Sequence, residues 1–549
     1  MSPRLRSSAR LAALAALPLL VLAVFFVLPV AGMVSRGFFT AGQFDPGAVV
    51  DVLGRARVGQ VLWFTVWSAG LATAVTVGLG LPLAFVLHRL RFPGRGLLRG
   101  FVLMPFVMPT VVVGVAFRTL LVRSGPLGAL HLDGTPVAIV AAMVFFNLAV
   151  VVRTVGALWE GLDRRREEAA AALGASPWQV LRTVTLPALA PGIVSAASVV
   201  FLFFATSFGV VLTLGGLRYA TVETEIYLLT TQYLDLRAAS ALSVLQLLVV
   251  TVLLYVAQRT RSAREQSLDR AAVRDTTRRP RRHDVPVLGV AVLALALVAA
   301  PLLTLLLGSL RDTTGWTLDH YRALTTTGGG ALLVPVSEAL GNSWRVAVDA
   351  TLLAMLLGVL VSLVVAGQAR SRAGRRGLAT LDAVFMLPLG VSAVTLGFGF
   401  LVTLDRPPLD LRSSAVLVPI AQALVALPLV VRTLAPVLRS VDPRQRQAAA
   451  SLGASPSRVL LSVDLPVLWR PLLAATGFAF AVSLGEFGAT SFLARPERPT
   501  LPVVIYQLIS RPGEQNLGTA LAASVVLGVL IVAVMAVVER LRLGSVGAF

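Results

Sequence analysis

The chain alternates long apolar runs with short polar connections. Apolar runs occur near residues 12–34, 61–87, 100–121, 136–158, 192–214, 239–257, 285–310, 344–366, 379–404, 414–437, 471–494 and 517–538. Each run is close to the ~20 residues that a helix needs to cross the hydrocarbon core of a bilayer. The pattern predicts an all-α polytopic membrane protein with about 12 transmembrane helices, divided into two halves of about six.

Composition narrows the class of protein further. Of the 549 residues, 56% are hydrophobic and 14% are charged, and the mean hydropathy of +0.83 is far above that of a soluble domain. The chain has no Cys and no Lys, which excludes disulfides, thiolate metal sites and a Walker A phosphate loop. We therefore expect this chain to bind no cofactor or metal and not to hydrolyse ATP by itself.

Two polar connections carry the same motif. Glu168–Pro187 reads EAAAALGASPWQVLRTVTLP, and Gln447–Pro466, 279 residues later, reads QAAASLGASPSRVLLSVDLP. Each copy lies between long apolar runs, which places it at a face of the membrane. A generic helical hairpin explains one such copy, but two copies with the same spacing favour a part that docks onto another protein.

The local sequence predicts two short helices in each copy. An Asp caps the first helix and a Gly ends it, whereas a Ser-Pro pair starts the second helix and a Leu-Pro pair stops it before the next span. These residues are Asp163, Gly174, Ser176-Pro177 and Leu186-Pro187 in the first copy, and Asp442, Gly453, Ser455-Pro456 and Leu465-Pro466 in the second. The small alanine face of the first helix would let another protein's backbone approach closely.

This repeated motif resembles the EAA loop of permease subunits of bacterial binding-protein-dependent ABC importers. Two loops in one chain resemble the fused, two-module permeases of the iron(III) and thiamine importers, and the resemblance covers nearly the whole chain. It implies two type-1 permease modules whose loops dock onto an ATP-hydrolysing subunit. The residues implied in docking are Glu168, Ala169, Ala170, Gly174, Gln447, Ala448, Ala449 and Gly453, with Gln447 standing where the family usually has Glu.

The resemblance also implies partners and a substrate class. Two copies of a separate ABC ATPase, which hold ATP and Mg²⁺, would dock on the loops. An extracytoplasmic solute-binding protein would deliver a small-molecule substrate of the thiamine or iron(III) type. Ser207–Gly216 and His88–Arg95 also look like segments of these permeases, with the thiamine type somewhat closer. Such motifs belong to the scaffold and do not fix the solute.

The arginines predict the orientation of the chain in the bacterial cell membrane. The net charge is +21, and two short loops in corresponding places carry arginine clusters without acidic residues. The clusters are Arg89, Arg91, Arg95 and Arg99, and Arg370, Arg372, Arg375 and Arg376. Because basic residues stay on the cytoplasmic side, both termini and both repeated loops are expected in the cytoplasm. Orientation in a lipid membrane explains the basic charge, and no nucleic-acid partner is expected.

The predicted organisation is two modules joined by a linker. The first module spans 1–258 with its loop at 163–190, a basic cytoplasmic linker covers 259–284, and the second module spans 285–549 with its loop at 442–470. An even number of spans in each module gives a parallel repeat about an axis along the membrane normal. The solute pathway is then expected between the two halves.

Six residues are candidates for that pathway. Prolines and glycines interrupt the matching third spans of the halves, where they either line the pathway or allow close helix packing. Glu486 is a carboxylate inside the run 471–494, and its counterpart in the first half is Ser207. We expect Glu486 to face a cavity and favour a cationic or polar solute, with a local ion pair or helix cap as the alternative. The complete set is Glu486, Ser207, Pro109, Gly114, Pro388 and Gly397.

Two other classes of protein fit part of the pattern. A secondary active transporter of about 12 spans, driven by an ion gradient, would also have two parallel halves, but it needs ionisable residues in its spans and no duplicated loops. A membrane-embedded enzyme is disfavoured because the chain has no Cys, only 4 His and no paired carboxylates in its spans. The function that the sequence predicts is the permease subunit of an ABC importer.

Overall fold

The computed structural model is almost entirely helical. It describes residues 3–40, 42–216, 218–262, 277–313, 315–327, 332–366, 372–405, 410–411 and 414–543. Residues 263–276 of the predicted linker and Arg370 of the second arginine cluster lie outside the described residues. Within these, the only strands form two antiparallel hairpins, which are β1–β2 (Phe39–Thr40, Gln43–Phe44) and β3–β4 (Arg311–Asp312, Gly315–Trp316).

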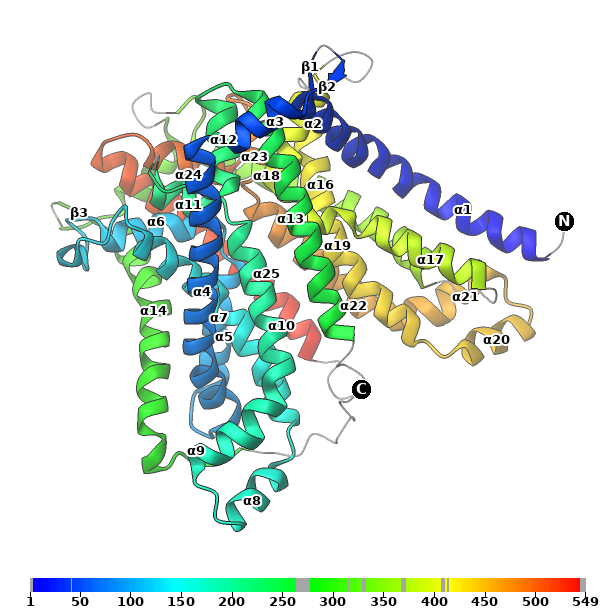
Figure 1. Ribbon diagram of the computed structural model, residues 1–549, viewed down its shortest axis with the longest axis horizontal. Helices are drawn as coiled ribbons and strands as arrows, with labels where there is room; N and C mark the ends of the chain where they lie inside the picture. The colour runs from blue at the N-terminus through cyan, green and yellow to red at the C-terminus, as the bar shows by residue number, and fades with distance from the viewer. Residues whose placement is uncertain are drawn as a thin grey trace. The chain divides into compact units, whose positions relative to one another are not determined.

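Figure 1 shows the helices in chain order. Those of the N-terminal half are α1 Pro3–Leu22, α2 Leu28–Phe38, α3 Pro46–Leu53, α4 Ala56–Arg89, α5 Arg95–Val107, α6 Thr110–Leu121, α7 Pro136–Gly161, α8 Arg164–Ala172, α9 Pro177–Val180, α10 Leu186–Ala205, α11 Gly209–Gly215, α12 Val222–Thr231 and α13 Leu236–Ser262. Those of the C-terminal half are α14 Val285–Ser309, α15 Asp319–Arg322, α16 Val336–Val365, α17 Arg372–Phe385, α18 Ala393–Thr403, α19 Leu417–Ser440, α20 Pro443–Ser451, α21 Pro456–Val459, α22 Leu465–Gly485, α23 Thr490–Leu493, α24 Leu501–Ile509 and α25 Glu514–Leu543. Short π and 3₁₀ segments are η1 Ala23–Val27, η2 Gly128–Leu130, η3 Leu181–Thr185, η5 Arg282–Asp284, η6 Ala323–Thr325, η7 Leu387–Gly390 and η8 Leu460–Asp464.

Ten helical segments of the described residues are long and apolar enough to cross a membrane, and the bent pair α5–α6 would make an eleventh. The predicted count of about 12 is therefore not confirmed. The axes of α5 and α6 differ by 105°, with Pro109 at the break. The predicted span 379–404 is likewise divided at Pro388 into α17, η7 and the short apolar helix α18. Both breaks have one cause, since proline has no N–H to donate and its ring clashes with the preceding turn.

Contacts between helices group the chain into two compact units. Unit 1 comprises Met1–Val49, Ile226–Leu247 and Tyr321–Phe549, and unit 2 comprises Val50–Glu225 and Leu248–His320. Unit 1 therefore contains most of the second predicted module with two segments of the first, and unit 2 contains most of the first with the beginning of the second. The predicted module boundaries describe the sequence repeat, and they stay a prediction.

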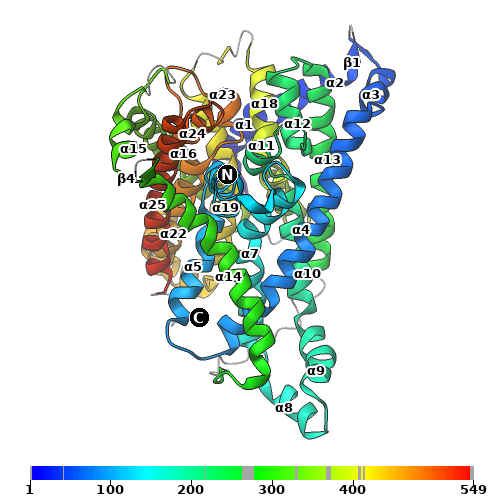
Figure 2. The same ribbon diagram turned by 90° about the vertical axis from the view of Figure 1, so that its left-hand side faces the viewer.

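Unit 2 is built around α4, α7 and α10, which pack against one another and bury an apolar cluster that includes Ala84, Val155 and Trp159. Gly80 permits the close approach of α4 to α7, because a side chain there would collide with Val151. The helix α14, which opens the second predicted module, packs on α4 and α6. Figures 1 and 2 show α8 and α9 beyond the end of α10, at the opposite end of this unit from α11.

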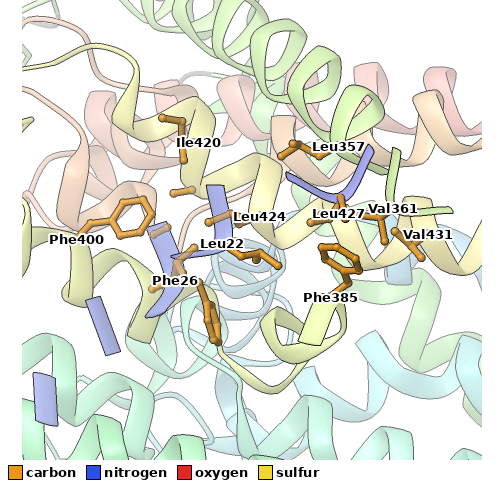
Figure 3. Packing of buried hydrophobic residues seen from close by; sticks show 14 of the residues in the cluster. Leu22, Phe26, Leu357, Val361, Phe385, Phe400, Ile420, Leu424, Leu427 and Val431 are labelled. Carbon is orange, nitrogen blue, oxygen red and sulfur yellow. The ribbon is translucent and has the colours of Figure 1, made fainter. Parts of the chain in front are cut away.

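Unit 1 repeats this arrangement with α16, α19 and α22, and α25 packs on α22. Here α1 packs on α16 and α2 on α18, so the first helices of the first predicted module belong to this unit. Leu22 and Phe26 of this N-terminal segment lie in one buried cluster with Leu357, Phe385 and Phe400 (Figure 3). The first long helix of each predicted module thus packs on helices of the other module.

Replacing Leu22 by Ala should lower the free energy of unfolding by about 2 kcal/mol or more, because a cavity replaces the packing of a buried side chain. Leu22 is 3% exposed, whereas Leu20 on the same helix is 61% exposed. Leu20→Ala is therefore the matched control and should cost less than about 1 kcal/mol. Thermal denaturation in detergent measures both variants, and equal stabilities would contradict the packing of α1 on α16.

Candidate functional site

The two repeated loops have the local structure that their sequences predict. Asp163 caps α8 and Asp442 caps α20, each accepting a hydrogen bond from the backbone N–H two residues later, at 3.0 and 2.9 Å. After each helix a glycine adopts a left-handed conformation, with φ of +89° at Gly174 and +82° at Gly453. A side chain would be strained at this angle, so glycine is required for the turn. The predicted caps and glycine turns are confirmed.

The second helix of each loop differs from the prediction in one respect. It begins as expected at Ser176, which forms a capping box with Gln179, but it does not stop at the Leu-Pro pair. Instead α9 continues through the π segment η3 into α10, with the N–H of Leu186 donating to the carbonyl of Leu181. The wider π turn and the first-turn position accommodate Pro187 without a helix break. The second loop continues through η8 into α22 in the same way.

The predicted docking residues lie on exposed helices, since no residue of α8 or α20 is buried. Glu168 forms an ion pair with Arg164 of the same helix, at 3.0 Å.

The prediction missed an apolar residue at the end of each helix, where Leu173 is 90% exposed and Leu452 is 89% exposed. The sequence signal was available, because both copies contain the same LGASP segment. Each loop therefore presents an exposed leucine beside its left-handed glycine, at the same position in both copies. The remaining predicted docking residues follow the same pattern in both copies, with Ala169, Ala448, Gln447, Gly174 and Gly453 exposed and Ala170 and Ala449 half-buried.

The predicted pathway residues are all buried and fall into two groups, one in each unit. In unit 2, Pro109 precedes α6, and Gly114 of α6 lies against Thr213 of α11, the helix that follows Ser207. Unit 1 repeats this design with Pro388 before α18, Gly397 in α18 and Glu486 before α23. A Cβ atom at Gly397 would lie 2.7 Å from the Cα of Ala489, so this glycine permits close helix packing. A role in the pathway stays a prediction.

Glu486 lies at the break between α22 and α23 and caps the second helix. Its carboxylate is buried and accepts hydrogen bonds from the backbone N–H of Ala489 at 2.7 Å and of Thr490 at 3.0 Å. The hydroxyl of Thr490 accepts from Gln422 Nε2 at 3.3 Å, and Gln422 Oε1 is buried without a hydrogen-bond partner among the described residues. The helix cap that the sequence left open as an alternative is therefore present, at the centre of a buried polar cluster.

Comparison with known proteins defines the class of this chain. The sequence profile of the family described as "Binding-protein-dependent transport system inner membrane component" matches residues 77–264 and 327–542. The chain belongs to this family, and it is the multi-pass membrane permease subunit of an ABC importer with two modules in one polypeptide. This result supports the predicted function, and nothing in it supports the ion-gradient alternative.

Several known proteins are similar to this chain, some over both modules and others over about half of it. The thiamine transport system permease protein ThiP of Brucella abortus (strain 2308) is 28% identical over 526 residues, which cover 92% of this chain and 91% of that protein. ThiP of Escherichia coli (strain K12) is 29% identical over 83% of this chain and 84% of its own length. The sulfate transport system permease protein CysT of the same organism is 31% identical over 43% of this chain and 87% of its own. A crystal structure of a bacterial alginate ABC transporter aligns with 48% of this chain and 97% of its own, at 16% identity and a TM-score of 0.41.

The substitution Glu486→Gln should reduce solute uptake while the protein still assembles, because Gln keeps one of the two oxygens that accept from N–H groups at the start of α23 but lacks the carboxylate. Glu486→Ala also removes the cap and should lower stability by about 1 kcal/mol or more. Uptake into proteoliposomes and thermal denaturation separate the two effects. Normal uptake by the Glu486→Gln variant would show that this residue acts only as a helix cap and not on the solute.

Proposed function

We propose that this permease imports a small cationic solute of the thiamine type, with iron(III) as the alternative, using ATP hydrolysed by a separate subunit. The proposal for the solute is supported by relatives named as thiamine permeases, which align with both modules over 92% of the chain. Glu486 would supply a negative charge for such a cation. Among the described residues, this carboxylate accepts hydrogen bonds from uncharged groups of Ala489 and Thr490, and no arginine forms an ion pair with it.

The single observation that carries the proposal for energy coupling is the duplicated, exposed loop. Each loop would bind one copy of an ABC ATPase, which holds ATP and Mg²⁺. Leu173 and Leu452 would fill an apolar groove on that partner, in the way that a few buried anchors dominate most interfaces. The glycines beside them would let the partner's backbone approach closely. The other proposed docking residues are Glu168, Ala169, Ala170, Gly174, Gln447, Ala448, Ala449 and Gly453.

Motion of the docked ATPases would reach the membrane through continuous helices. Because α9 continues into α10 and α21 into α22, displacement of the second helix of each loop moves its span directly. Movement of the spans would then open the pathway alternately to the two sides of the membrane. The two buried groups around Ser207 and Glu486, with Pro109, Gly114, Pro388 and Gly397, are the proposed pathway residues.

The remaining partners follow from the orientation predicted by the arginines. With both termini and both loops in the cytoplasm of a bacterial cell, a solute-binding protein would deliver the solute from the opposite side. Lipid would surround the exposed apolar faces of the spans. We propose no nucleic-acid partner and no cofactor on this chain.

Combining Leu173→Asp with Leu452→Asp should reduce co-purification of the ATPase by about tenfold or more, because a charge replaces the apolar anchor in each loop. Leu333→Asp is the matched control, since Leu333 is 74% exposed outside the loops and should leave co-purification unchanged. Affinity purification of the tagged permease, with the ATPase quantified, measures the effect. Full co-purification with the double variant would exclude the loops as the docking site.

Reconstitution tests the solute and the energy source together. Proteoliposomes that contain the permease and ATPase, supplied with the binding protein, should accumulate labelled thiamine only when ATP is hydrolysed. Accumulation of iron(III) instead would select the alternative solute. Uptake driven by an ion gradient with no nucleotide consumed would overturn the proposed function.

A further inference from the structure

Each docking helix is joined to the π turn beneath it by a polar contact at equivalent positions. In the first loop, Thr185 Oγ1 of η3 donates to Glu167 Oε1 of α8, at 2.9 Å. In the second loop, Arg446 Nε of α20 donates to Asp464 Oδ1 of η8, at 2.8 Å. The repeat offset of 279 residues relates Glu167 to Arg446 and Thr185 to Asp464. The same two positions are therefore in contact in both copies, although the acidic residue has moved from the helix to the π turn.

The first contact extends to the neighbouring span. The guanidinium of Arg89, at the end of α4, forms an ion pair with Glu167, and the Arg89 side chain is only 5% exposed. The backbone of Arg89 and Arg91 bonds to Arg278, which precedes α14, at 3.0 and 2.8 Å. The docking helix α8 is therefore held by Thr185 to η3, which leads into α10, and by Arg89 to the end of α4.

The second contact is also reinforced. Arg446 donates through a second nitrogen to the carbonyl of Leu438 at 3.0 Å, which links α20 to the end of α19. The Asp464 side chain is 10% exposed and that of Arg446 is 26% exposed. At this burial an ion pair is less screened by solvent than a surface pair, and removal of one partner leaves a poorly solvated charge.

We propose that Glu167–Thr185 with Arg89, and Arg446–Asp464, are two loop clasps that fix the angle between each docking helix and its membrane span. This inference rests on the proposed docking of ATPases at the loops. Without the clasps, the docking helix could rotate about the glycine turn relative to α10 or α22. Motion of the ATPase would then move the docking helix without moving the span. These are positioning residues, because they act through the docking helix and not on the solute.

Exchange of the second clasp's charges tests this proposal in the reconstituted complex. Arg446→Asp and Asp464→Arg should each lower the solute imported per ATP hydrolysed by about fivefold or more, while ATPase co-purification persists. The double variant Arg446→Asp/Asp464→Arg restores the opposite charges and should recover about half of the wild-type ratio or more. Arg444→Asp is the matched control, because it makes the same charge change on an exposed position of α20 and should keep the wild-type ratio.

The first clasp allows a milder test that preserves shape. Thr185→Val removes only the hydroxyl that bonds to Glu167 and should lower the import ratio by about twofold or more. Thr183→Val, in the same π turn, removes an exposed hydroxyl bonded only to its own helix and is the control. A structural defect alone would reduce the amount of complex without changing this ratio.

The outcomes separate the two proposals. Failure of the ATPase to co-purify with the wild-type permease would overturn the proposed function. With co-purification intact, wild-type ratios for Arg446→Asp and Thr185→Val would overturn the clasps alone. An equal loss in Arg444→Asp, or no recovery in the double variant, would also overturn them, since charge or folding rather than pairing would then cause the effect.

Discussion

Satisfaction of backbone hydrogen bonds within a bilayer is the constraint on which this structure depends. An unpaired N–H or C=O in hydrocarbon costs several kcal/mol, so the chain can leave a helix only where other protein groups bond to the freed backbone. Glu486 meets this need at the start of α23. The hydroxyls of Thr65 and Ser343 meet it at the starts of α12 and α24, where they accept from the N–H of Val222 at 3.2 Å and of Leu501 at 2.7 Å. Interrupted helices thus become a stable way to place polar groups inside the membrane.

The two halves repeat this architecture with different side chains. Where the second half places Glu486 near Gln422, the first half has Ser207 donating to the sulfur of Met143 at 3.2 Å. Similarly, Trp159 packs on Phe85 in the first half, whereas Leu438 at the equivalent position of the second half lines a cavity of about 120 Å³. The two repeats therefore differ at these buried positions, while their docking loops have kept nearly identical sequences.

The sequence predicted what local physics controls. Caps such as Asp163 and turns such as Gly174 depend on a few adjacent residues, and the family resemblance followed from their spacing. The passage of the loop into α10 was not predictable, because Pro187 is normally a stop signal and the π turn that absorbs it has no sequence mark. The clasps need contacts between residues far apart on the helices, such as Arg89 and Glu167. The same limit applies to the packing of each module's first long helix on the other module, because these contacts join residues far apart in the sequence.

The packing of α1 and α2 on helices of the second predicted module has a consequence for how the protein is made. The helices α1 and α2 are translated well before their packing partners α16 and α18, which follow the rest of the first predicted module and the linker. Until then the face that carries Leu22 and Phe26 meets lipid or the insertion machinery in place of its native neighbours. Packing of α1 and α2 in unit 1 therefore waits until α16 and α18 of the second predicted module have been made. Truncated chains or separate expression of the two modules would leave α1 and α2 without these packing partners.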